Sequence, residues 1–120
     1  MENDTVQSIT WGSSILVGQL DLKYLPPTVM YLEITDNHLT GSLDLTELSP
    51  VLQDFTFNRN EFTGELNLTC LPDNFEHLGG TENRLSGSLN LEYLPQRLVT
   101  LSLGKNLLTS QFVSRSFRHR

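Results

Sequence analysis

Three polar residues could do chemistry together: Asp54, His77 and Thr100 supply a carboxylate, an imidazole and a hydroxyl at one constant spacing. These are the groups of a nucleophilic triad, in which an acid orients an imidazole and the imidazole activates a hydroxyl. Threonine is rarely a nucleophile away from an N-terminus, and no motif in the sequence supplies an oxyanion hole. We therefore expect a solvated acid–imidazole contact beside a threonine, and no catalysis.

These residues can act together only if the fold repeats with the same spacing and so brings them side by side. Glycine and asparagine do recur at the same interval, at Gly18, Gly41, Gly64 and Gly87 and at Asn37, Asn60, Asn83 and Asn106. Apolar residues recur between them, as at Leu32, Phe55, Leu78 and Leu101. The period predicts four stacked units of equal length, which are 18–40, 41–63, 64–86 and 87–109.

The two ends depart from this period. Residues 1–17 contain half a unit, and we expect Trp11 to point inward and cover the leucines of the next unit. Residues 110–120 form a basic tail that contains Arg115, Arg118 and Arg120. Phe112, Val113 and Phe117 could fold back as a makeshift cap. The alternatives are a disordered tail and an array that continued in a longer ancestor.

Elementary physical chemistry predicts the shape of each unit. The alternation of Leu32 and Ile34 is typical of a short strand with one buried face, and parallel strands stack about 4.8 Å apart. Each repeated asparagine lies where the chain turns, so that its amide can satisfy backbone groups. Each repeated glycine lies at the next corner, where we expect a positive φ. The Leu-x-Leu that follows the glycine predicts a second, narrow strand.

Each unit reads G-x-L-(D/N)-L-x-x-L-P-x-x-L-x-x-L-x-L-x-x-N-x-L-(T/S), which resembles a leucine-rich repeat, and most of all those of protist proteins. The resemblance implies a β-rich solenoid with little or no helix. It implies a right-handed stack of parallel strands on a concave face and short second strands on the convex side. The residues expected to face outward on the concave side are Tyr31, Glu33, Thr35, Asp54, Thr56, Asn58, His77, Thr81, Thr100 and Ser102.

This resemblance implies a non-enzymatic module that binds another protein through its concave face, with Tyr31 as an aromatic anchor and the acidic residues facing a basic partner. The alternative is a structural fragment, or a truncated paralogue of a longer repeat protein, with no binding function of its own. We expect a monomer with no cofactor and no metal ion. Because the predicted face is only about 20–25 Å long, we expect weak affinity unless the rims take part.

Composition excludes several classes of protein. Eight basic and 14 acidic residues give a net charge of −6, which argues against binding of nucleic acid. No apolar run approaches the roughly 18 residues of a membrane span. The polar, acidic start predicts a cytoplasmic protein, so the sequons at Asn3 and Asn67 are expected to stay unused. The single cysteine, Cys70, excludes an internal disulfide and is expected to be an exposed thiol.

Two further positions carry predictions about structure. The residues that precede the repeated asparagines alternate in sign, which predicts a surface ladder of ion pairs: Asp36, Arg59, Glu82 and Lys105. Gly80 occupies a strand position that is apolar in the other units, such as Phe57. We interpret Gly80 as drift in a redundant repeat, with Phe57 either leaning into the gap or leaving a cavity.

Overall fold

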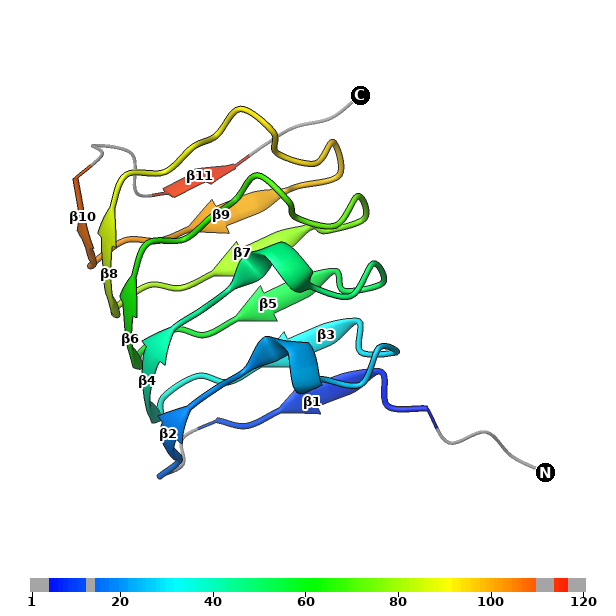
Figure 1. Ribbon diagram of the computed structural model, residues 1–120, viewed down its shortest axis with the longest axis horizontal. Helices are drawn as coiled ribbons and strands as arrows, with labels where there is room; N and C mark the ends of the chain where they lie inside the picture. Colours follow the sequence, from blue (N-terminus) through cyan, green and yellow to red (C-terminus); the bar gives the residue numbers. More distant parts are fainter. Residues whose placement is uncertain (1–4, 13–14, 110–113, 117–120) are drawn as a thin grey trace.

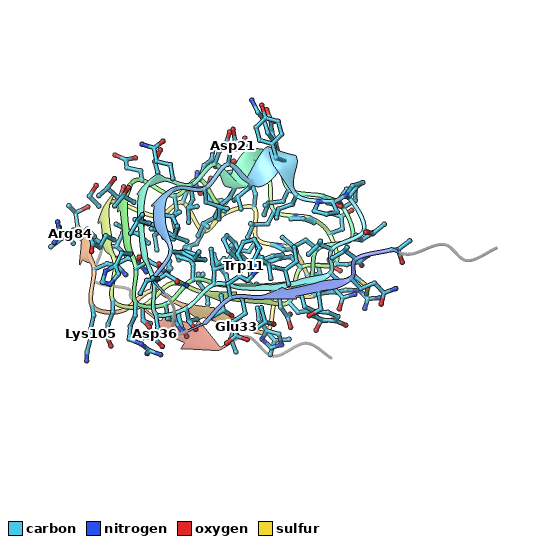
Figure 2. All side chains as sticks on the ribbon, turned by 90° about the horizontal axis from the view of Figure 1, so that it is seen from below. Trp11, Asp21, Glu33, Asp36, Arg84 and Lys105 are labelled. Atoms are coloured by element: carbon cyan, nitrogen blue, oxygen red, sulfur yellow. The ribbon has the colours of Figure 1, made fainter. Side chains whose placement is uncertain are left out.

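The computed structural model describes residues 5–12, 15–109 and the backbone of 114–116. Over these residues the chain forms a parallel-strand solenoid of about four turns with two narrow sheets, which run along two adjacent sides of the coil (Figure 1 and Figure 2). The β-rich solenoid with little helix that the repeat predicted is therefore confirmed.

The first sheet is formed by the Leu-x-Leu segments and the end of the chain. Its strands, in spatial order, are β1 (Ser8–Thr10), β3 (Tyr31–Glu33), β5 (Asp54–Thr56), β7 (His77–Gly79), β9 (Thr100–Ser102) and β11 (Ser114–Ser116). Strands β1 to β9 pair in parallel with an offset of one full repeat, so that Leu32, Phe55, Leu78 and Leu101 are direct partners. The length of the sequence repeat therefore sets the register between neighbouring strands of this sheet.

The second sheet contains β2 (Val17–Gln19), β4 (His38–Ser42), β6 (Glu61–Gly64), β8 (Arg84–Gly87) and β10 (Leu107–Leu108). Strands β2 to β8 end at or near the repeated glycine, so the prediction that they would follow it was wrong. The glycines have positive φ values, 84° at Gly64 for example, which confirms the prediction for these corners. The backbone turns out of the second sheet at or just after these glycines.

The segment after the glycine forms tight turns instead. Asp21 and Asp44 accept hydrogen bonds from the backbone N–H two residues later, at 3.2 and 2.9 Å, and cap the short 3₁₀ helices η1 (Leu22–Tyr24) and η2 (Leu45–Glu47). Asn67 makes the equivalent bond to Thr69 N–H at 3.0 Å. The alternating Asp or Asn of this segment is therefore a capping position rather than a strand residue.

The core fills the interior of the coil, enclosed by the two sheets and by the segments that contain η1 and η2 (Figure 2). It consists of apolar residues at equivalent places in successive turns, and the four central strand residues Leu32, Phe55, Leu78 and Leu101 are at most 1% exposed. Leu39, Phe62 and Leu85 of the second sheet belong to the same buried cluster. Each turn therefore buries its apolar residues against its neighbours, as a solenoid requires.

The two ends of the first sheet differ. At the C-terminal end, β11 pairs with β9 in the antiparallel direction, whereas the other pairs of this sheet are parallel. At the N-terminal end, Trp11 lies over the interior of the coil (Figure 2). It remains 43% exposed, so it covers this end less fully than we predicted. Phe112, Val113 and Phe117 lie outside the described residues.

None of the helices in the described ranges has the length and apolar character needed to cross a bilayer.

Candidate functional site on the outer face of the first sheet

The outer face of the first sheet carries the polar residues that flank the buried strand centres. Successive side chains of a strand point to opposite faces, so the neighbours of Leu32 and Phe55 point away from the core. Figure 2 shows Glu33 on this outer side and Trp11 on the inner side. Tyr31, Glu33, Asp54, Thr56, His77, Thr100 and Ser102 lie in the strands, and Thr35, Asn58 and Thr81 closely follow them.

Exposure changes along this face. Tyr31 and Glu33 on β3 are exposed, with Tyr31 at 41%. Asp54 and Thr56 on β5 and His77 on β7, nearer the centre of the sheet, are half-buried. The aromatic anchor is therefore near the N-terminal end of the face, and its titratable groups are near the centre.

The three residues of the hypothetical triad are neighbours, but they are not connected as a triad. Asp54 pairs in register with His77, and His77 with Thr100. Nδ1 of His77 lies 2.8 Å from the Thr100 hydroxyl, within hydrogen-bond distance. Asp54 Oδ1 is buried and has no hydrogen-bond partner, so this oxygen does not orient the imidazole. An oxygen of Asp54 and a nitrogen of His77 nevertheless lie within 4.8 Å of each other, so the predicted proximity of acid and imidazole is present, in half-buried rather than solvated surroundings.

Glu76, which the sequence reasoning missed, is close to these residues. Its Oε1 lies 3.9 Å from His77 Nε2. Donor atoms of Asp54, Glu76 and His77 all lie within 4.8 Å of one another. The repeat concealed this group, because the residues equivalent to Glu76 in the other units share no chemical type: Met30, Gln53 and Val99.

Burial changes the electrostatics of Asp54. Its partial removal from water raises the pKa of the carboxyl group, the nearby His77 opposes this shift, and Glu76 adds to it. The centre of the face therefore holds a carboxylate that lacks a full set of partners for its charge.

The repeated asparagines lie inside the turns that follow the first sheet. The Asn60 amide nitrogen donates to the carbonyl oxygens of Ile34 and Phe57, at 2.7 and 3.1 Å, and its Oδ1 accepts from Leu39 N–H at 3.2 Å. Asn83 repeats this pattern one turn later, with bonds to the carbonyls of Phe57 and Gly80. Each amide thus joins two successive turns through buried backbone groups.

The charged row beside the asparagines is less regular than the predicted ladder. Arg59 donates to both carboxylate oxygens of Asp36, and Nη2 lies 2.8 Å from Oδ2. Lys105 lies 3.9 Å from Glu82, but no ion pair joins Arg59 to Glu82 within the described residues. The row is therefore two separate pairs. Arg59 lowers the pKa of Asp36 through this hydrogen bond.

Gly80 is a requirement of the packing and not drift. A Cβ atom on Gly80 would lie 2.4 Å from two ring atoms of Phe57, so the Phe57 ring occupies the space that a side chain would need. The ring also meets Phe55 and Phe62, at centroid distances of 4.8 and 5.6 Å. Phe57 therefore leans into the gap and fills it.

Cys70 is a free, exposed thiol, as predicted. The side chain of Asn67 accepts bonds from the Thr69 backbone and hydroxyl in the exposed turn. Asn3 lies outside the described residues.

No protein-family model, curated protein or solved structure matches this chain.

Proposed function

We propose that this protein is a non-enzymatic binding module that recognises another protein through the outer face of the first sheet. The observation that carries the proposal is the continuous polar face over β3, β5, β7 and β9, whose side chains stand in strict register on a rigid support. Rigid strands present side chains with little loss of conformational entropy on binding, which favours recognition.

The resemblance of the units to leucine-rich repeats supports this proposal, because the equivalent face of such repeats is their concave, protein-binding side. The chemistry of the face favours a basic partner. Glu33 and Asp54 supply negative charge, and Tyr31 supplies an exposed aromatic ring next to them.

Size limits the affinity that this face can provide. Strands spaced about 4.8 Å apart make it about 20–25 Å long, and a stable interface buries roughly 800 Å² per partner. Residues such as Asp36 and Arg59 at the rim of the sheet therefore have to contribute if the complex is long-lived.

The single cysteine allows a direct test of the binding face. Cys70 occupies the place of Tyr24 in η1, on the side opposite the first sheet (Figure 2). A protein tethered to a resin through Cys70 leaves the outer face free, whereas a Tyr31→Cys, Cys70→Ser variant tethered through residue 31 blocks it. We expect a partner to be retained by the first resin and not by the second, and to be released at high salt.

A matched pair of variants completes the test. Tyr31→Ala with Asp54→Ala should abolish retention, and Tyr24→Ala with Glu47→Ala, on the opposite surface, should not. If Tyr24→Ala with Glu47→Ala abolished retention instead, the partner would bind the surface around η1 and η2, which would contradict the proposal. A failure of both resins to retain any protein would favour a purely structural role.

A further inference from the structure

We propose that Asp54, Glu76 and His77 form a binding site for a divalent transition-metal ion on the outer face of the first sheet. The inference does not depend on a protein partner. It rests on three donor groups from adjacent strand segments, one carboxylate oxygen from each acid and one nitrogen of the imidazole, all within 4.8 Å of one another.

The orientation of His77 supports this assignment. Its Nδ1 lies 2.8 Å from the Thr100 hydroxyl, and its Nε2 lies 3.9 Å from the Glu76 carboxylate. When Nδ1–H donates to the Thr100 oxygen, the lone pair of the neutral ring is on Nε2, the nitrogen nearer to Glu76. Metal-binding histidines are held in this way by a hydrogen bond from the other ring nitrogen. Thr100 is thus a positioning residue.

The buried oxygen of Asp54 is the second argument. Oδ1 has no hydrogen-bond partner, and a buried carboxylate oxygen without one is costly. A cation bound by the carboxylates of Asp54 and Glu76 would neutralise two neighbouring negative charges and so reduce this cost. His38 and Glu61 form a similar pair at 3.4 Å, but among the described residues they have no such third group.

The donor set indicates the class of metal. One imidazole nitrogen and two carboxylate oxygens suit Zn²⁺, Mn²⁺ or Ni²⁺, whereas Ca²⁺ and Mg²⁺ prefer oxygen ligands only. Bonds of about 2.0–2.2 Å place the donors of a tetrahedral site roughly 3.4 Å apart. Rotation of the half-buried Glu76 side chain can shorten its distance to His77, which Thr100 holds in place. Three protein ligands leave a coordination position for water.

Zinc titration with calorimetric readout tests the proposal. We expect one saturable site in the Cys70→Ser protein, in which the exposed thiol cannot bind the ion. Glu76→Gln and His77→Ala should each weaken binding at least about tenfold, because each removes a ligand. The matched controls Glu61→Gln and His38→Ala change the similar pair on the second sheet and should leave the affinity within about twofold.

A spectroscopic readout separates coordination from a structural effect of the substitutions. Nitrogen NMR of the apo protein should show His77 protonated at Nδ1, and Zn²⁺ should shift Nε2. Thr100→Val should reduce the Nδ1–H population and weaken binding about tenfold or more while the far-ultraviolet spectrum stays unchanged. If Glu76→Gln and Glu61→Gln bind Zn²⁺ equally, or if the Cys70→Ser protein shows no saturable binding, the proposed site does not exist.

Discussion

Asn60 and Arg59 are adjacent in the sequence and belong to the same turn, but their surroundings are opposite. Asn60 is 7% exposed and holds backbone groups of two turns together, whereas the Arg59 side chain is 49% exposed and reaches a single carboxylate. The sequence shows the same difference between the two rows over the whole stack. The inner row is asparagine in every unit, and the outer row is Asp, Arg, Glu and Lys in turn.

This difference shows what keeps a repeat position constant. A buried N–H and two buried carbonyl groups require one side chain that donates and accepts in a fixed place, and asparagine does both. The outer position requires only a side chain that water can solvate. All four residues of this row nevertheless have φ between 56° and 60°, a left-handed conformation that the alternating charges gave no reason to expect.

Among the substitutions considered, replacement of Asn60 by leucine should reduce the stability of the protein most. The two side chains have the same branched shape, but leucine can make no hydrogen bonds and leaves several buried backbone groups unsatisfied, so we expect a loss of about 3 kcal/mol in the free energy of unfolding. Urea denaturation measures this loss. The control is Arg59→Gln, which we expect to change stability far less. Equal losses would show that burial does not separate the two rows.

Substitutions at Gly80 test whether this buried position accepts a larger residue once its neighbour Phe57 is made smaller. Gly80→Leu restores the apolar residue of the other units, yet we expect it to cost roughly 1–3 kcal/mol because Phe57 fills the space. Phe57→Leu in the same protein should recover most of this loss. A double-mutant cycle by urea denaturation should give a coupling of about 1 kcal/mol or more. Additive effects would mean that the ring and the glycine are independent.

The left-handed backbone conformation of the outer row should have a smaller effect on stability, which substitutions at Glu82 can measure. Glu82→Val places a β-branched residue at φ 60°, whereas Glu82→Gly relieves the same conformation. Both variants lose the weak contact with Lys105, so the effect of this loss cancels when their stabilities are compared. We expect glycine to exceed valine in stability by about 1–2 kcal/mol in thermal denaturation. Equal stabilities would show that the turn does not hold this φ in solution.

The smallest expected effects are those of two carboxyl groups with opposite pKa shifts. The pKa of Asp36 is lowered by Arg59, so its contribution to stability is present near neutral pH and disappears as the pH falls. The pKa of Asp54 is raised by burial, so the native state is favoured at low pH and loses this advantage as the pH rises.

In the presence of a chelator, Asp36→Asn should therefore lower the melting temperature at pH 7, and Asp54→Asn should raise it. The Asp54 difference should shrink as the pH falls through its raised pKa, which lies above the ordinary value of 3.8, whereas the Asp36 difference should shrink only as the pH falls below 3.8. Shifts of the same sign at pH 7 would contradict the assignment of Asp54 as a partly desolvated carboxylate.

Much of the fold could be predicted from particular residues. Leu32, Phe55, Leu78 and Leu101 are direct partners in the first sheet because each lies one repeat before the next, and each is buried because the adjacent turns cover it. The candidate site was only partly predictable. His77 and Thr100 are neighbours by period, but Glu76 has no periodic counterpart and lies directly before β7, outside the regular strand.

The sequence by itself determined the period, the parallel order of the strands and the buried residues, because a short apolar segment can be covered only by its own repeat in the adjacent turn. Tertiary structure decided the rest. In the second sheet, partners such as Gly41 and Phe62 are closer in the sequence than one full repeat, so each of these strands is shifted along its neighbour relative to the equivalent residues. The antiparallel strand β11, the filling of the space at Gly80 by the Phe57 ring and the approach of Glu76 to Asp54 depend on side-chain and segment positions that the repeat does not encode.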